Sequence, residues 1–374
     1  MRTAIAVAAI VIGPTCLLFA QPGGSPSGRV GILLAAGDVS YCKDDEDWKL
    51  YPNKAADIIR QVVKDAKAET PPIPVRLLAL GDLGYPDGTP DQLDCFRGRW
   101  GEFYDLMLPV PGNHEYRATN PDGRPYFEHF SKHGPFIARD GKQVPLVASV
   151  GDKLGYYALN FPREKGPWRL IALNAYVGGQ KKGKQEDEKR RQAMKAQLEW
   201  LTNNIDTKKG NDQSCVLAFW HPPTFTSGRH GHVDYTNTKP NAALSKERSM
   251  GAALRILYRH GASIVLAGHE HNYEQFSRHD GEGKSKPKDG LRSFVVGTGG
   301  VPLTEDFYTI REKNSEGLYG RDRGSQGLLK IDLYENRYEW EFLSIEKIRG
   351  TKKEKKVLHL KSTKENCTKR PPAS

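Results

Sequence analysis

His269 and His271 stand two residues apart, at the point where an apolar run of the sequence ends. The run covers residues 263–267 and is typical of a short buried strand, so both histidines lie where the strand gives way to a loop. Side chains at positions i and i+2 of an extended segment share a face, which lets both imidazoles point at one small volume. This spacing is typical of metal ligands, although a lone His-x-His pair also occurs in ordinary polar loops.

Four further apolar runs each end in a residue that can bind a metal: Asp38 after 30–36, Asp82 after 75–80, Asn113 after 106–110 and His221 after 215–220. Each of these residues has an ordinary alternative, since Asp after Gly often occupies a turn and Asn-His often forms a cap. In open α/β sheets, however, ligands bind beyond the carboxyl ends of strands, where side chains distant in sequence can meet. Five strand ends of this kind predict a site for two metals.

The motifs together resemble the motif series of the calcineurin-like metallophosphoesterases: Gly37-Asp38, Gly81-Asp82-Leu83-Gly84-Tyr85, Gly112-Asn113-His114-Glu115, His221 and Gly268-His269-Glu270-His271. The resemblance runs from about residue 30 to about residue 343. Within that superfamily the chain is most similar to the purple acid phosphatases, in a bacterial, single-domain form. The reasons are Tyr85, three residues after Asp82, and Ser40, which stands where most other members carry a histidine.

The resemblance implies an α/β fold, a four-layer αββα sandwich in which two mixed β-sheets are flanked by helices. It also implies two metal ions, Fe(III) with Zn(II), Mn(II) or Fe(II). The implied ligands are Asp38, Asp82, Tyr85 and His271 at one metal, and Asp82, Asn113, His221 and His269 at the other. Asp82 would bridge the pair, and a shared carboxylate suits two neighbouring cations.

Two further histidines are candidates for contact with the substrate. His114, adjacent to Asn113, could orient phosphate or protonate the leaving alkoxide, and its alternative role is a structural hydrogen bond. His230 resembles a histidine that contacts substrate in the purple acid phosphatases. His232 could take the same place, and a solvated loop histidine is an equally good reading.

These residues predict an exported phosphatase that hydrolyses phosphomonoesters through a metal-activated hydroxide. The alternative is a metal-dependent phosphodiesterase acting on nucleotides or phospholipid head groups. The sequence does not separate the two, because the choice depends on the shapes of the loops at 117–153 and 222–245. A binding protein without turnover is a third reading, and the complete set of candidate ligands argues against it.

The chain has 374 residues and a formal net charge of +11. A basic surface attracts anionic substrates, so a small phosphate ester is the expected partner. Nucleic acid is not expected, because the sequence has no basic motif interleaved with aromatic residues. The oligomeric state is not indicated.

Residues 1–20 are expected to be a secretory signal peptide, because Arg2 precedes an apolar stretch that ends at Ala20. An uncleaved anchor is the competing reading, since the stretch is nearly long enough to span a membrane. We therefore expect a secreted or periplasmic protein with no stable membrane span after cleavage. A catalytic domain is expected over 30–346, and a basic, mobile C-terminal tail over 347–374.

Four cysteines follow the expected signal peptide: Cys42, Cys95, Cys215 and Cys367. In an exported chain they suggest two disulfides, for which three pairings exist. Cys42 with Cys95 is favoured, because both lie just beyond strand-end motifs that should be neighbours. The rival reading makes Cys42 a metal ligand.

The remaining elements follow from hydrophobic periodicity. Helices are expected at 53–68, 185–206 and 247–260, and further strands at 156–161, 168–175, 291–296, 327–333 and 337–343. The Gly- and Pro-rich segment 117–153 is expected to be a long loop.

Overall fold

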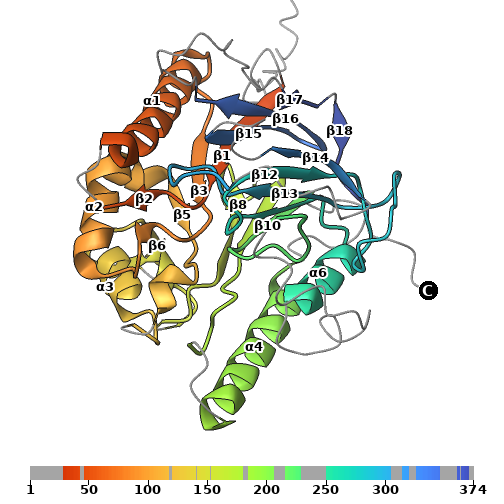
Figure 1. Ribbon diagram of the computed structural model, residues 1–374. Helices are drawn as coiled ribbons and strands as arrows, with labels where there is room; N and C mark the ends of the chain where they lie inside the picture. The colour runs from red at the N-terminus through yellow and green to blue at the C-terminus, as the bar shows by residue number, and fades with distance from the viewer. Residues whose placement is uncertain are drawn as a thin grey trace, which may run out of the picture.

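The computed structural model describes residues 28–42, 46–117, 120–139, 141–151, 153–179, 184–205, 215–228, 250–304, 314–319, 326–345, 360–362 and 364–369. Within these ranges, two seven-stranded sheets pack face to face and helices cover their outer faces (Figure 1). This arrangement confirms the αββα sandwich expected from the sequence.

The first sheet has the strand order β17-β16-β15-β1-β3-β5, and β18 also pairs with β16. Its strands are β1 Arg29–Ala36, β3 Val75–Ala79, β5 Met107–Pro109, β15 Gly327–Tyr334, β16 Arg337–Ser344, β17 Leu360–Lys361 and β18 Glu365–Asn366. β1, β3 and β5 run parallel, whereas β15 is antiparallel to both β1 and β16. The sheet is therefore mixed, and its three parallel strands end at one edge.

The second sheet has the order β14-β12-β13-β11-β10-β9-β8. Its strands are β8 Tyr157–Phe161, β9 Trp168–Ala172, β10 Cys215–Phe219, β11 Ile264–Ala267, β12 Tyr273–Phe276, β13 Arg292–Val296 and β14 Ser315–Tyr319. β9, β10, β11 and β13 are parallel, β8 and β12 are antiparallel to them, and β14 is antiparallel to β12. This sheet is mixed as well.

The core lies between the two sheets. Leu33 and Leu329 of the first sheet belong to the same buried cluster as Leu170 and Phe219 of the second. β1 is apolar along most of its length because its inner residues are buried on both faces, whereas β15 and β16 alternate between buried and partly exposed residues.

Helices form the outer layers (Figure 1). Their bounds are α1 Glu46–Ala68, α2 Pro90–Trp100, α3 Arg124–His133, α4 Lys184–Asn204 and α6 Met250–Arg259. α4 and α6 pack on the second sheet, where Leu201 and Leu254 share a buried cluster with Val216. Ile59 of α1 and Phe96 of α2 join the core of the first sheet.

Short elements connect these layers. They are the 3₁₀ turns η1 Gly101–Leu106, η2 His114–Tyr116 and η3 Leu146–Ala148, the parallel pair β2 Ser40–Tyr41 and β4 Gly84–Tyr85, and the hairpin β6 Phe136–Arg139 with β7 Lys142–Pro145. The β2–β4 pair joins the loops that follow β1 and β3, and so holds two motif-bearing loops together.

The expectation of a long loop over 117–153 was wrong, because this segment contains α3, the β6–β7 hairpin and η3. The aromatic residues Tyr126, Phe127 and Phe130 are buried on one side of α3. Gly123 and Gly134 flank the helix and Pro125 lies in its first turn. The glycines and prolines that suggested a loop therefore mark the ends of a helix. The α2 helix was missed as well, although Pro90 at its first position follows the N-cap Thr89.

The expected mobile tail is partly wrong. β17 and β18 pair with β16, and Cys367 forms a disulfide with Cys215 at the start of β10. The described residues of this segment therefore belong to the sandwich. The favoured disulfide between Cys42 and Cys95 is confirmed, which removes the Cys42 thiolate as a metal ligand.

The expected signal peptide over residues 1–20 lies outside the described residues. Among the residues that the structure does describe, no helix combines the length and the apolar character needed to cross a membrane.

Candidate metal centre

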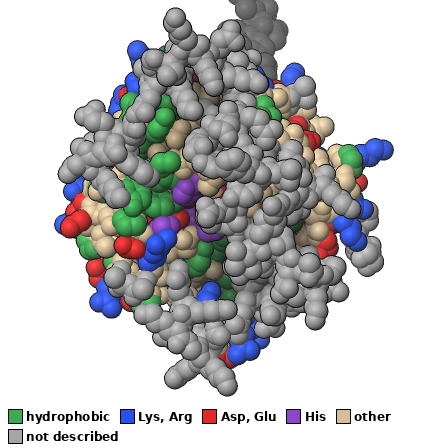
Figure 2. All heavy atoms as spheres, viewed as in Figure 1, with side chains coloured by type: hydrophobic (Ala, Val, Ile, Leu, Met, Phe, Trp, Pro, Cys, Tyr) green, Lys and Arg blue, Asp and Glu red, His purple; other side chains and the backbone are tan. Residues whose placement is uncertain are grey.

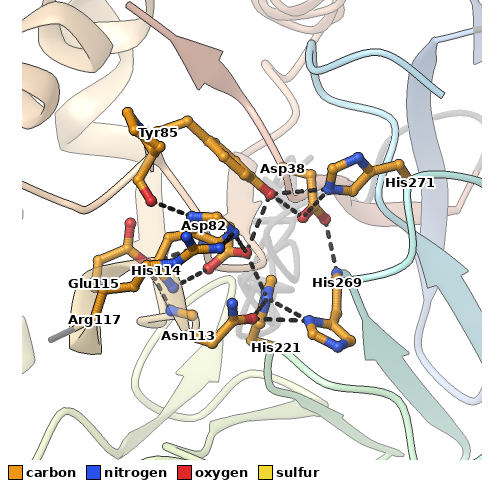
Figure 3. A network of polar contacts seen from close by, with 12 residues as sticks. Asp38, Asp82, Tyr85, Asn113, His114, Glu115, Arg117, His221, His269 and His271 are labelled. Atoms are coloured by element: carbon orange, nitrogen blue, oxygen red, sulfur yellow. Dashed lines mark hydrogen bonds and ion pairs between the residues drawn. The ribbon is translucent and has the colours of Figure 1, made fainter. Parts of the chain in front are cut away.

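The seven candidate ligands meet at one edge of the sandwich, where parallel strands of both sheets end. Asp38, Asp82 and Asn113 follow β1, β3 and β5, and His221 and His269 follow β10 and β11. The backbone N–H of Gly37 donates to the carbonyl of Val296 at 2.9 Å, which ties the ends of the two sheets together. Figure 3 shows the side chains turned toward a common centre.

Asp38, Tyr85 and His271 form a first cluster. The Tyr85 hydroxyl donates to Asp38 Oδ1 at 2.7 Å and lies 3.1 Å from His271 Nε2. His271 Nδ1 lies 3.2 Å from the carbonyl oxygen of Pro302, which can only accept, so Nδ1 is the donor. This bond turns Nε2 toward Asp38 and Tyr85, in the manner that orients histidine ligands.

Asn113, His221 and His269 form a second cluster. Asn113 Oδ1 lies 3.1 Å from His221 Nε2 and 2.9 Å from His269 Nδ1, and the two ring nitrogens are 3.2 Å apart. His221 Nδ1 donates to the Leu80 carbonyl at 2.7 Å, so its Nε2 faces the other two side chains.

Asp82 lies between the two clusters. Its Oδ2 is 3.1 Å from the Tyr85 hydroxyl and 3.1 Å from His221 Nε2, so one carboxylate oxygen contacts a member of each cluster. Its Oδ1 accepts the backbone N–H of His114 at 2.8 Å. The residue is 1% exposed and cannot turn away without breaking these contacts.

The backbone is strained at three of these positions. Among the described residues, positive φ angles in non-glycine residues occur at Asp38 (60°), Asp82 (51°), Lys153 (54°) and His269 (75°). A left-handed conformation is unfavourable for a residue with a Cβ and costs about 1–2 kcal/mol. Such strain persists where the surrounding structure enforces it, typically at functional sites. Three of the four strained residues are candidate ligands, which marks this edge independently of any motif.

The site stabilises positive charge. Burial alone would lower the pKa of His221, but the Asp82 carboxylate outweighs it and raises that pKa to about 9. Burial likewise opposes ionisation of Asp82, yet the neighbouring histidines hold its pKa well below the usual range. Burial and the charge of His221 lower the pKa of His269 to about 4, so this ring is neutral at neutral pH. His221 would have to give up its Nε2 proton to bind a metal.

The donor set fits metal ions. Ligand atoms of Asp82, His221 and His269 all lie within 4.8 Å of one another. Carboxylate, amide oxygen, imidazole and phenol oxygen together match iron, zinc or manganese, and hydrogen bonds from Nδ1 already orient two of the imidazoles.

The two clusters open onto a cavity of about 440 Å³, lined by Tyr41, Asp82, Tyr85, Pro86, Asn113, His114, Arg117, His269, His271, Val301 and Pro302. Figure 2 shows histidine side chains at the surface near the middle of one face, with a basic side chain beside them. A small anion can therefore reach the candidate ligands from solvent.

His114 and Arg117 stand together in the cavity wall. His114 Nδ1 bonds to the Pro86 carbonyl, which fixes the ring and directs Nε2 toward Asp82 Oδ2 at 3.6 Å. The Arg117 guanidinium lies 3.0 Å from the same Nε2 and donates to it. Burial lowers the pKa of His114, although Asp82 opposes the shift. Arg117 was not singled out in the sequence, because no spacing rule identifies it.

Glu115 is the positioning residue that sequence reasoning missed. It is fully buried, and its two oxygens accept four backbone N–H groups, from Gly112 (2.7 Å), Asp82 (3.0 Å), Leu83 (2.8 Å) and Gly84 (3.3 Å). Burial and the nearby Asp82 carboxylate raise the pKa of Glu115 to about 7, against the effect of these bonds. Glu115 thus joins the loop after β3 to the loop after β5. In the sequence it appeared as the last residue of the Gly112-Asn113-His114-Glu115 motif, which gave it no role.

The remaining candidates, His230 and His232, lie outside the described residues, so the structure gives them no place relative to the cavity.

The sequence of this chain is similar to those of known phosphoesterases. A family model described as calcineurin-like phosphoesterase matches residues 33–273. Purple acid phosphatase 15 of Arabidopsis thaliana is 26% identical over 287 residues, which make up 69% of this chain and 43% of that protein. The chain therefore spans less than half the length of this curated relative.

Solved structures resemble the fold at low sequence identity. The purple acid phosphatase PPD1 from yellow lupin (Lupinus luteus) has a TM-score of 0.55 at 16% identity, covering 85% of this chain and 52% of that one. GAP50, the anchor in the inner membrane complex of Plasmodium, has a TM-score of 0.54 at 13% identity, covering 91% and 90%. PhoD also has a TM-score of 0.54, at 11% identity, covering 91% and 70%. At these identities the likeness shows the fold alone.

Proposed function

The chain belongs to the calcineurin-like phosphoesterase family, and on that premise we propose that it is a dinuclear-metal phosphatase that hydrolyses phosphomonoesters. The observation that carries the proposal is the place of Asp82 Oδ2, 3.1 Å from Tyr85 in one cluster and 3.1 Å from His221 in the other. One oxygen in contact with two sets of donors suits a pair of neighbouring cations better than a single one.

In this proposal each cluster would hold one metal, with Asp82 shared. Asp38, Asp82, Tyr85 and His271 would hold the first metal, and Asp82, Asn113, His221 and His269 would hold the second. The phenol oxygen of Tyr85 favours Fe(III) in the first site, with Zn(II), Mn(II) or Fe(II) in the second. When bound, the two cations supply Lewis acidity and make water an effective nucleophile near neutral pH.

The chain itself supplies binding and proton transfer at the cavity wall. Arg117 is exposed and lies 3.0 Å from His114 Nε2, so a phosphoryl group at the candidate ligands comes within reach of both side chains. Arg117 binds phosphate oxygens through its guanidinium. The Pro86 carbonyl holds the His114 ring in place through Nδ1. When the Arg117 guanidinium turns from His114 Nε2 to the phosphate, Nε2 is free to take up a proton, which His114 is proposed to donate to the leaving alkoxide.

The charge of the cavity wall supports monoesters over diesters. A phosphomonoester carries a second ionisable oxygen with a pKa near 6, so near neutral pH it is more negative than a diester. Arg117 and the net charge of +11 both favour the more negative substrate. A phosphodiesterase is the alternative outcome of the test below.

We also propose that the protein is exported, to the periplasm or the medium, and that residues 1–20 are its signal peptide. The two disulfides support this proposal, because structural disulfides persist in oxidising compartments.

The test replaces Asp82 by Asn and His221 by Ala and measures turnover of an aryl phosphomonoester and an aryl phosphodiester. Both variants should lose hydrolysis and metal while remaining folded, because no neighbour can replace a shared or buried ligand. His260→Ala, at a half-buried position outside the cavity, serves as the control. Near wild-type turnover in either ligand variant contradicts the proposed ligand set. Faster turnover of the diester by the wild type contradicts the monoester assignment alone.

The role of His114 is tested with His114→Ala and substrates that differ in leaving group. Loss of a proton donor should slow alkyl phosphates more than activated aryl phosphates, by roughly 10²-fold. If His114→Ala slows hydrolysis of alkyl and aryl phosphates equally, His114 positions phosphate and does not act as the proton donor.

A further inference from the structure

Three side chains on the outer helices form a second group with the chemistry of metal ligands, and none of them lines the central cavity. They are Asp94 of α2, and His129 and His133 of α3. We propose that α2 and α3 hold a Zn(II)-type cation between these three residues, independently of the dinuclear centre. Figure 1 shows the two helices side by side.

The geometry brings the three donors together. His129 and His133 are four residues apart on α3 and therefore share a face of the helix. One ligand atom from each of the three residues lies within 4.8 Å of the others, and His129 Nδ1 is 3.8 Å from Asp94 Oδ1. Two ligands at the usual zinc distances in a tetrahedron are about 3.3 Å apart. Bound metal would draw in the exposed Asp94 and the half-buried His133, whose side chains can rotate, around the fixed ring of His129.

A hydrogen bond on the side facing away from Asp94 orients the ring of His129. The ring is buried, and its Nε2 lies 2.7 Å from the hydroxyl of Tyr104, which is also buried. An outer hydrogen bond of this kind orients a metal-bound imidazole and leaves the other nitrogen for the metal. His129 Nδ1 and Asp94 Oδ1, at 3.8 Å, are too far apart for a hydrogen bond. Binding a metal between them would therefore break no existing hydrogen bond of this pair.

Both histidines are held in the neutral form that binds metals. Burial lowers the pKa of His129 to about 4, and burial together with Arg97 and Lys132 lowers the pKa of His133. Within the described residues, neither ring nitrogen of His133 has a hydrogen-bond partner. Arg97 competes for the carboxylate, since its Nε lies 3.3 Å from Asp94 Oδ1, but this pair is exposed and contributes little.

Two imidazoles and one carboxylate are ligands typical of Zn(II), with water in the fourth position. The cation would cross-link α2 to α3. The α2 helix carries Cys95 of a disulfide, and its Gln92 backbone packs against Gly84, next to Tyr85. Metal bound between the helices would therefore stiffen the layer behind the first cluster.

The experiment equilibrates the full-length protein with Zn(II) and measures bound zinc per chain by atomic emission after dialysis. His133→Ala and Asp94→Asn test the site, because both side chains are at least partly exposed and their loss leaves the core intact. Glu128→Ala is the matched control, since Glu128 is an exposed acidic residue on the same helix. His221→Ala serves as the background in which the central site is disrupted.

We expect His133→Ala and Asp94→Asn each to bind one zinc fewer than the wild type and than Glu128→Ala. Turnover should be unchanged in both, and zinc should raise their Tm less than it raises that of the wild type. The same loss should appear when His133→Ala is combined with His221→Ala, which separates this site from the proposed function. Equal zinc content in the wild type and His133→Ala, or equal loss in Glu128→Ala, overturns the inference.

Discussion

If the proposed monoester activity is right, Arg117 should distinguish the two classes of phosphate ester by charge. Arg117→Ala should lower kcat/KM for an aryl phosphomonoester by roughly 10-fold to 10²-fold, the value of one charge-assisted hydrogen bond. The effect on a diester should be smaller, because the diester carries less charge. Arg124→Ala removes another exposed arginine from outside the cavity wall and should leave both rates unchanged. Equal losses for the two esters would show that Arg117 does not select between them.

Tyr85 should give the loaded protein a visible colour. Its hydroxyl lies 2.7 Å from Asp38 and 3.1 Å from Asp82, and burial and these carboxylates raise its pKa well above the usual value. Only a strongly charged cation such as Fe(III) is expected to displace that proton. The ferric protein should show a broad phenolate-to-iron absorption that Tyr85→Phe removes without unfolding the chain. An iron-loaded, active wild type without this band would contradict the assignment of Tyr85.

The sequence predicts which side chains lie together when each of them comes just after a strand of the sheet. Asp82 and His221 come together because each directly follows a parallel strand, and the ends of such strands share an edge. Glu115 and Arg117 could not be assigned in this way. Their roles depend on how the loop after β5 folds back, and no periodicity encodes that path.

The loops at the strand ends admit little added volume. A Cβ on Gly112 would overlap the Oδ1 oxygen and the backbone nitrogen of Asp82, whereas a Cβ on Gly98, in α2, would meet open space. Gly112→Ala should therefore displace Asp82 and reduce kcat by about 10²-fold, as small misplacements in active sites do. Gly98→Ala should keep full activity and gain about 0.5–1 kcal/mol of stability. Unchanged kcat in Gly112→Ala would show that the loop can relax around the added methyl group.

At the level of elements, long apolar runs gave reliable predictions and short or polar elements did not. β1 and β10 were expected almost to the residue because their inner positions are buried on both faces. β12 was missed because it is only four residues long and has polar residues at its centre, and α3 because it is a short helix between glycines. The Gly and Pro residues around α3 were interpreted as a loop when they mark helix ends.

Across the whole molecule, the disulfide between Cys215 and Cys367 ties the last described segment to the start of β10. Replacing both residues by Ser should lower the free energy of unfolding by about 2–4 kcal/mol, measured in urea. Turnover at low temperature should persist, since His221 lies beyond the opposite end of β10. Lys369→Ala, at an exposed neighbouring position, is the control. An unchanged unfolding midpoint in the double variant would show that strand pairing alone holds this segment.

Composition could not predict the role of this segment. Its many charges favoured a tail, yet β17 and β18 need only two residues each to pair with β16. The layered architecture was predictable from the resemblance, because the order of the motifs fixes which strands end at the common edge.

Anomalous X-ray diffraction from crystals of the metal-loaded, active protein would show directly whether two cations share Asp82. We expect two anomalous peaks, one among Asp38, Tyr85 and His271 and the other among Asn113, His221 and His269, with Asp82 between them. Their absorption edges would also identify the metals. Crystals of active protein that show a single peak at this edge of the sandwich, or none, would contradict a dinuclear site that shares Asp82.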